Sequence, residues 1–164
     1  MAMALTPIKR TKNLVPLSKD HHEGLLAVWK VRQGVHHKIE PGRINNFIGH
    51  AFDTHLQPHF IEEEELLFNQ LPDSDPYLVK AKEQHASLRK MVEEVRSSSE
   101  VTYSRLASFA DLLEEHIRFE ERELFGHLEG AVSPAILEAI GSSLQDIHSM
   151  KKPLYWEDQF WLRK

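Results

Sequence analysis

The sequence contains no cysteine among its 164 residues. Disulfides, thiolate nucleophiles, iron–sulfur clusters and cysteine-based zinc sites are therefore excluded. It also contains no apolar run approaching about 18 residues, the length that crosses a bilayer, so we expect no membrane partner. Basic residues are in the minority, with 20 against 25 acidic ones and a net charge of −5. We expect no nucleic acid partner either, because phosphate binding needs a basic face.

The first residues, Met1 to Lys12, include no apolar stretch long enough for a signal peptide. We therefore expect a cytoplasmic protein. A hydrophobic content of 41% is ordinary for a globular protein, and the length suits a single domain over residues 1–164. The unusual figure is the 11 histidines. In the absence of cysteine, imidazole and carboxylate groups must carry any metal chemistry.

Proline, glycine and serine residues divide the chain into helices, and no alternating strand pattern is present. We predict a polar lead-in over residues 1–16, a metal-binding bundle over 17–130, and a C-terminal helix and tail over 131–164. The bundle helices are predicted at about 18–34, 41–69, 76–97 and 101–128, with Ser18 or Asp20 as the first N-cap and an interruption at Pro58. The predicted fold is all-α, an up-down-up-down four-helix bundle with an additional C-terminal helix and an aromatic tail.

The aromatic tail contains Tyr155, Trp156, Phe160 and Trp161. We expect these rings to pack across the open end of the bundle. The alternative is a contact between two copies of the chain, because aromatic residues are enriched at interfaces. The sequence therefore leaves both a monomer and a weak homodimer open.

A ten-residue pattern, H-x-x-x-E-E-x-x-L-F, occurs twice in the chain, from His59 to Phe68 and from His116 to Phe125. Residues four apart lie on the same face of a helix, so His59 pairs with Glu63 and His116 pairs with Glu120. Both pairs are in line with core positions, where an unpaired carboxylate costs several kcal/mol. Two such helices facing each other would supply the donors of a site for two metal ions.

Other histidines extend this set. His85 lies in the apolar seam of its helix. His22 is expected to face inward because apolar residues follow it at helical spacing, and His21 is either its support or the alternative ligand. His55 is expected either to donate to a carboxylate or to lie in the core. Glu123, seven residues after His116, could ligate in place of Glu120.

Three other acidic residues of the two copies, Glu64, Glu65 and Glu121, are expected to point toward solvent. Arg32 and Arg89 are the basic residues on inward faces that could neutralise Glu63 and Glu120 without a metal. We therefore favour a metal cation as the compensating charge.

The order of the ligands separates two kinds of metal-binding bundle. Ferritin-like proteins place Glu three residues before His, and no histidine of this chain has that neighbour. The order found here, with His first, resembles the hemerythrin-like (HHE cation-binding) family. The resemblance rests on four segments: Leu17-Ser-Lys-Asp-His-His22, His59-Phe60-x-x-Glu63-Glu64, Glu83-Gln-His85 and His116-x-x-x-Glu120-Glu121.

This resemblance implies a non-haem di-iron centre, with two Fe ions bridged by two carboxylates. Carried over to this sequence, the terminal ligands would be His22, His59, His85 and His116, and the bridges Glu63 and Glu120. The same donors also accept Mn or Zn.

The chain departs from the pattern of the oxygen-carrying members, which have a second histidine four residues along the third helix. Arg89 follows His85 at that spacing and Ala81 precedes it. Six protein ligands would then leave a position for oxygen, peroxide or nitric oxide. The resemblance implies a protein that binds metal and a small ligand, with an iron or oxygen sensor, an iron-storage protein or a peroxide- or nitric-oxide-reacting enzyme as alternatives.

Overall fold

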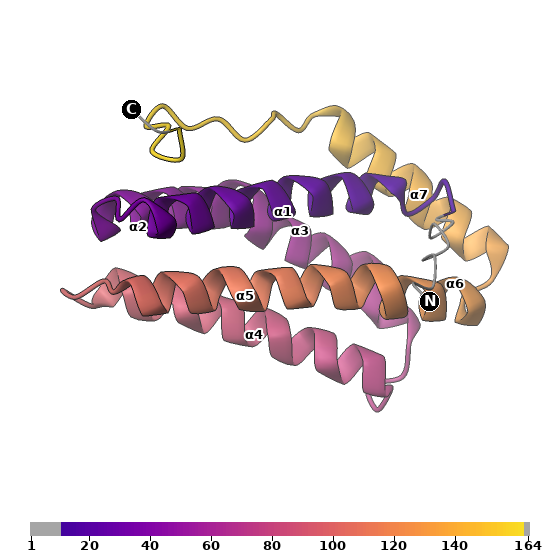
Figure 1. The fold of residues 1–164 in the computed structure, drawn as a ribbon. Coiled ribbons are helices and arrows are strands. Elements are labelled where there is room, and N and C mark those ends of the chain that lie inside the picture. Colours follow the sequence, from indigo (N-terminus) through magenta and orange to yellow (C-terminus); the bar gives the residue numbers. More distant parts are fainter. Residues whose placement is uncertain (1–10, 163–164) are drawn as a thin grey trace, which may run out of the picture.

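The computed structural model describes residues 11–162, and these residues form helices and connecting segments without a strand (Figure 1). The all-α prediction is confirmed for this part of the chain, while the up-down-up-down order of a four-helix bundle stays a prediction. Among the described residues, none of the helices combines the length and the hydrophobicity that spanning a bilayer requires. The α-helices are α1 (Val15–His36), α2 (Pro41–Ala51), α3 (Gln57–Glu62), α4 (Pro76–Ser97), α5 (Tyr103–Phe119), α6 (Phe125–Ala131) and α7 (Pro134–Ser149).

Shorter helical turns connect several of these elements. Three of them are π-helices, η1 (Phe52–Leu56), η2 (Glu63–Leu67) and η4 (Glu120–Leu124), and η3 (Phe68–Gln70) is a 3₁₀ turn. The helix predicted at 41–69 is therefore a continuous series of helical elements that alternate between α-helix, π-helix and 3₁₀ turn. Pro58 lies in the first turn of α3, directly after the wide turn η1. This wide turn accommodates the interruption that Pro58 requires.

Side chains cap the starts of α2, α4, α5 and α7. Asp75 accepts hydrogen bonds from the backbone N–H groups of Tyr77 and Leu78 at the start of α4, and Thr102 caps α5. The cap prediction for the first helix was wrong, because α1 begins at Val15 after Leu14, which makes no side-chain cap bond. Ser18 and Asp20 lie inside α1, and their side chains instead reach the buried site described below.

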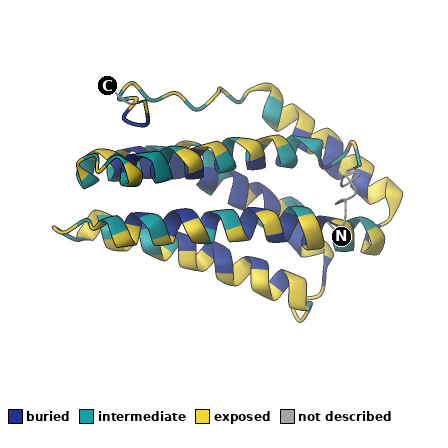
Figure 2. Ribbon diagram, in the orientation of Figure 1, coloured by how far each residue is buried: buried dark blue, intermediate teal, exposed yellow. Residues whose placement is uncertain are grey.

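Buried residues are marked dark blue along the helices in Figure 2. The apolar ones form two clusters of side chains, one toward each end of the helices. One cluster includes Phe47, Phe60 and Leu113, and the other includes Leu17 and Phe125. Between the two clusters lies a layer of buried histidine and glutamate side chains. The polar layer thus separates two apolar regions.

After α7 the chain returns along α1 to the end where α2 begins (Figure 1). There Phe160 and Trp161 are buried, and each ring centroid lies 5.6 Å from that of Phe47. A Cβ atom on Gly34 would lie 2.8 Å from Phe160 Cε2, so the glycine gives the tail its space. Packing of the tail on the helices is confirmed for Phe160 and Trp161. Tyr155 is 72% exposed, and a contact between two copies stays a prediction.

Candidate metal centre

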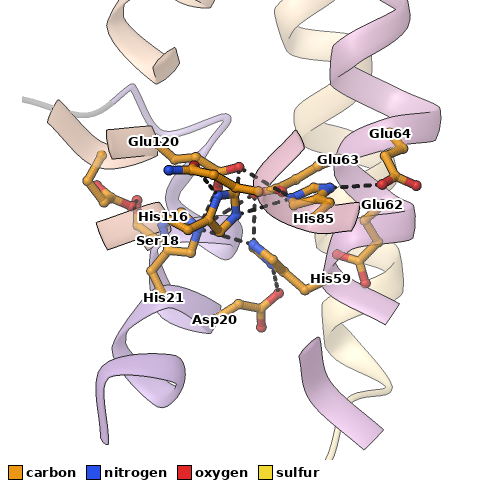
Figure 3. Close-up of polar contacts among 12 residues, drawn as sticks. Ser18, Asp20, His21, His59, Glu62, Glu63, Glu64, His85, His116 and Glu120 are labelled. Carbon is orange, nitrogen blue, oxygen red and sulfur yellow. Dashed lines mark hydrogen bonds and ion pairs between the residues drawn. The ribbon is translucent and has the colours of Figure 1, made fainter. Parts of the chain in front are cut away.

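Six histidine and glutamate side chains converge in the polar layer (Figure 3). None is more than 3% exposed. They come from six different helical elements, so the site exists only in the folded protein. The six are His21 from α1, His59 from α3, Glu63 from η2, His85 from α4, His116 from α5 and Glu120 from η4.

The donor atoms fall into two groups that share both carboxylates. His21 and His59 form one group with Glu63 and Glu120, and His85 and His116 form the other with the same two glutamates. Within each group the donor atoms lie within 4.8 Å of one another, which is close enough for one cation to contact all four.

Each carboxylate turns one oxygen toward each group. Glu63 Oε1 lies 2.7 Å from His59 Nε2, and Glu63 Oε2 lies 3.1 Å from His85 Nε2. Glu120 Oε2 lies 2.9 Å from His21 Nε2, and Glu120 Oε1 lies 3.0 Å from His116 Nε2. This is the arrangement in which two carboxylates can bridge two cations.

The two copies of the sequence repeat have the same unusual winding. A π-turn begins at each glutamate of the site and is closed by the phenylalanine of the motif, whose N–H donates to the glutamate carbonyl: Phe68 to Glu63, and Phe125 to Glu120. The extra residue in the turn changes the helical phase, so both the Leu and the Phe of each copy are buried. The π-turn therefore explains why Leu and Phe occupy the same two positions in both copies of the repeat, which α-helical periodicity alone does not explain.

The outer nitrogen of each histidine is held by a hydrogen-bond acceptor. All four Nδ1 atoms donate outward and all four Nε2 atoms face the two glutamates, which is the orientation typical of metal-ligating histidines. The acceptors are Glu121 for His21 at 2.7 Å, Asp20 for His59 at 2.9 Å, Glu64 for His85 at 2.8 Å and Gln84 for His116 at 2.8 Å.

Two of these acceptors contradict the prediction of solvated side chains. Glu64 accepts from His85 and from both terminal nitrogens of Arg89, and Glu121 accepts from His21 and Ser18. Glu65 is exposed, as expected. The second glutamate of each E-E pair, present in both copies of the repeat, was the signal for this role.

The inward face predicted for the first helix was also wrong. His22 is exposed, and His21 occupies the site. The prediction followed the large apolar residues, but Trp29 is 46% exposed. The buried face of α1 instead contains small residues such as Gly24, where a Cβ would lie 2.7 Å from Ile117 Cδ1. Close packing against α5 selects this face, because a larger side chain would not fit.

Two further candidates lie outside the cluster. Glu123 is exposed, because the π-turn between it and His116 removes the α-helical phase on which its prediction depended. His55 is half-buried and contacts Thr54 Oγ1 and the carbonyl oxygen of Lys152. Neither residue belongs to the two groups of donors.

Charge interactions shift the pKa values of the buried groups in opposite directions. Burial alone would lower the pKa of His59 and His85, but the surrounding carboxylates raise these values to about 9 and about 10. Burial likewise opposes ionisation of Glu63 and Glu120, yet the neighbouring histidines lower the pKa of both carboxyls. The site therefore favours two negative charges and attracts positive charge.

The outer carboxyls behave in the same way. Burial would raise the pKa of Asp20, but hydrogen bonds and charge interactions with His59 and Lys151 lower it to about 2. Burial would raise the pKa of Glu64, and contacts with His85 and Arg89 lower it to about 2. Both groups are therefore anionic at neutral pH and can hold the imidazoles in place.

Three carboxylate oxygens at the centre lack a hydrogen-bond donor in acceptable geometry: Glu63 Oε1, Glu63 Oε2 and Glu120 Oε1. The nearest imidazole nitrogens lie 2.7 Å from Glu63 Oε1 and 3.1 Å from Glu63 Oε2, but at unfavourable hydrogen-bond angles. Neither of the two arginines considered from the sequence supplies the missing charge, since Arg32 pairs with Asp111 and Glu114 and Arg89 pairs with Glu64. Imidazole and carboxylate donors suit Fe, Mn and Zn, so the residues fit a metal pair.

A comparison with protein families gives one match over most of the chain. Residues 13–128 match the family described as the hemerythrin HHE cation binding domain. The chain belongs to this family. Comparisons with curated proteins and with solved structures give no match.

A small apolar cavity borders the centre of this hemerythrin-family protein. The space open to the centre of a water-sized sphere is about 20 Å³, and about 10–15 Å³ of that measure holds one water. His21, His59 and His116 form part of its wall. Apolar side chains, among them Leu56, Leu113, Ile117 and Leu154, form much of the remainder.

Proposed function

We propose that the protein binds two iron ions and admits a small exogenous ligand, such as oxygen, peroxide or nitric oxide, at an open position beside them. The ligands would be His21 and His59 on one ion and His85 and His116 on the other, with Glu63 and Glu120 shared. The observation that carries this proposal is that each glutamate turns one oxygen toward each histidine pair.

Charge compensation supports the same conclusion. Two ionised carboxylates that are fully buried are costly unless cations or hydrogen bonds compensate them. Three of their four oxygens lack an acceptable donor. Two divalent ions would supply the required charge and contact these oxygens directly.

The cavity supports the choice of a small ligand. Its walls combine three of the site histidines with apolar side chains and with the polar residues Asp20, Glu23 and His55. A pocket of about 20 Å³ suits a diatomic or similarly small molecule and excludes organic substrates of ordinary size. Iron, when bound, would supply Lewis-acid or redox chemistry to such a ligand. The protein side chains would hold the imidazoles in orientation and limit access of bulk water.

Metal analysis of protein made in iron-replete cells tests the first part of the proposal. We expect about two irons per chain, with anomalous scattering from both positions. Glu63→Ala and Glu120→Ala should each lose most of the iron, whereas Glu123→Ala, which changes an exposed residue three positions from Glu120, should retain it. Full iron retention in both glutamate variants would refute the assignment.

Titration of the iron-loaded protein with azide and with nitric oxide tests the second part. We expect saturable changes in the near-ultraviolet and visible absorption. Peroxide separates an enzyme from a binding protein, because catalytic turnover indicates the former and stoichiometric reaction the latter. No spectral response to azide, nitric oxide or peroxide would contradict the open position.

A further inference from the structure

A second group of charged side chains lies directly behind His59. Asp20 accepts the Nδ1–H of His59 at 2.9 Å and also contacts the ammonium of Lys151 at 2.9 Å. Lys151 Nζ reaches Glu62 Oε1 at 2.7 Å, and His148 Nε2 donates to Glu62 Oε2 at 3.0 Å. One ammonium therefore joins two carboxylates, one of which holds a histidine of the site.

This group is shielded from solvent. Glu62 is 7% exposed, and the side chain of Asp20 is 15% exposed. The side chain of Lys151 is 25% exposed, so its ammonium lies at the edge of the protein and its contacts point inward. Contacts of this kind hold geometry better than exposed ion pairs, which are screened by water and salt.

The same arrangement occurs on the other side of the centre. Arg89 holds Glu64 with two nitrogens, at 2.7 and 3.1 Å, and Glu64 accepts from His85. Each histidine pair thus contains one imidazole whose carboxylate acceptor is fixed by a cationic side chain. Arg89 lies on α4, within the part of the chain that matches the family, and Lys151 follows α7, beyond that part.

The C-terminal segment is itself fixed against the helices that build the site. α7 packs against α1, and Gly141 allows the backbone of Asn13 to approach closely. After Lys151, the carbonyl oxygen of Lys152 contacts His55, and Leu154 reaches the wall of the cavity. Lys151 is therefore presented to Asp20 from a segment with several independent contacts.

We propose that Lys151 is a positioning residue for the metal centre: by fixing Asp20 it orients His59 and strengthens metal binding. The C-terminal segment outside the family match thereby becomes part of the site. This inference rests on the proposed function, since it concerns the same histidine. Without the ammonium, Asp20 can turn toward water, and the Nδ1–H of His59 loses the acceptor that fixes its ring.

Chelator competition on protein loaded with Zn²⁺ or Fe²⁺ measures the effect. We expect Lys151→Met to lower metal affinity about 10-fold or more, the usual range for loss of an outer partner of a ligand being about 10–100-fold. Lys151→Arg should retain most of the affinity, because it keeps the charge. Lys152→Met, a change at the exposed neighbouring lysine, is the matched control and should behave as the unaltered protein.

A double substitution separates action through Asp20 from general loosening. If Lys151 acts through Asp20, then Asp20→Asn combined with Lys151→Met should weaken binding no more than Asp20→Asn alone. Additive losses would contradict the inference. Should Lys151→Met fail to fold, Lys151→Arg and Asp20→Asn still provide the comparison with Lys152→Met.

Proton NMR of the Zn²⁺-loaded protein gives a readout that a merely structural role would not produce. The Nδ1–H resonance of His59 should shift or broaden in Lys151→Met, while that of His85, whose acceptor is held by Arg89, stays in place. Equal changes at both histidines, or unchanged metal affinity in Lys151→Met, would overturn the inference alone. Failure of the unaltered protein to bind two ions would overturn the proposed function as well.

Discussion

His21 and His59 direct their Nε2 atoms at each other across 3.1 Å, although the two residues come from α1 and α3. His85 and His116 repeat the relationship, with Nε2 atoms 3.1 Å apart. Two imidazole lone pairs at this distance repel each other unless a proton or a metal ion lies near both. The site is therefore built around positive charge, and protons and metal ions compete for it.

The stability of protein stripped of metal with a chelator should depend on pH through these protons. His59 and His85 have pKa values raised to about 9 and about 10, against about 6.5 in an unfolded chain. Their contribution to the free energy of unfolding is complete below pH ~6.5 and is lost as pH rises through these raised values. We expect the melting temperature of the stripped protein to fall steadily from pH 6.5 to 10.

The carboxyl groups Asp20 and Glu64 have the opposite effect on stability, which they lower as the pH falls. Asp20 and Glu64 have pKa values lowered to about 2, so their contribution is present above the unfolded values of about 4 and is lost as pH falls toward 2. The stripped protein should be most stable between about pH 4.5 and 6.5. Metal affinity should instead rise with pH until it passes the raised histidine pKa values of about 9 and about 10, because binding requires unprotonated imidazoles. A melting temperature that does not change above pH 6.5 would contradict the raised histidine pKa values.

Gln84→Ala should lower both the stability of the protein and its metal affinity, because Gln84 is the hydrogen-bond acceptor of His116. Gln84 is 7% exposed and supplies the neutral acceptor for the buried Nδ1–H of His116, at 2.8 Å. Its removal leaves that donor without a partner, which costs about 1–3 kcal/mol of unfolding free energy, and metal affinity should fall about 10-fold or more. Denaturant unfolding and chelator competition measure the two effects. Glu83→Ala, at the exposed neighbour, should change neither.

Gly141→Ala should destabilise the attachment of α7. A Cβ at this position would lie 2.5 Å from Asn13 Oδ1 and 2.9 Å from Asn13 Cα, so the backbone of one segment would have to move. We expect a net loss of about 1–2 kcal/mol, because the overpacking exceeds the gain in helix propensity. Gly126→Ala is the control, since a Cβ there meets nothing within 4 Å and should stabilise by about 0.5–1 kcal/mol. Equal effects of the two changes in denaturant unfolding would exclude the proposed crowding.

Asp75→Ala should shorten or loosen the start of α4 without affecting the metal. Asp75 accepts from the N–H groups of Tyr77 and Leu78, and His127 Nε2 donates to it at 2.6 Å. We expect a loss of roughly 1–2 kcal/mol from the missing cap. Asp73→Ala, which changes a side chain that is 98% exposed, should have little effect. A metal content that falls in Asp75→Ala would show that the start of α4 also supports the centre.

Helical periodicity located much of the site from sequence. Spacing by four residues placed His59 with Glu63 and His116 with Glu120, and the structure brings all four together with His85. The helix boundaries in the middle of the chain were also close, because Pro76 and the serines near Ser97 are strong start and stop signals. Metal ligation by these residues stays a prediction.

The errors have physical causes in two places. On α1 the choice of His22 over His21 followed large apolar side chains, whereas the buried face is selected by close approach at Gly24. In the repeats, the π-turns change the phase after each glutamate, so Glu123 points outward. Glu64 and Asp20 contact His85 and His59, which are distant in sequence. The periodicity of a single helix cannot predict contacts between different helices.

The polar layer between the two apolar clusters makes the stability of the helix packing depend on charge as well as on apolar burial. The hydrophobic effect stabilises the packing at each end of the helices. In the middle, the helices meet through buried histidine and glutamate side chains, and the stability of this layer depends on the cations that compensate the carboxylate charges. Cations bound in this layer would link the helices between the two apolar clusters. Metal binding would then raise the free energy of unfolding of both apolar clusters together.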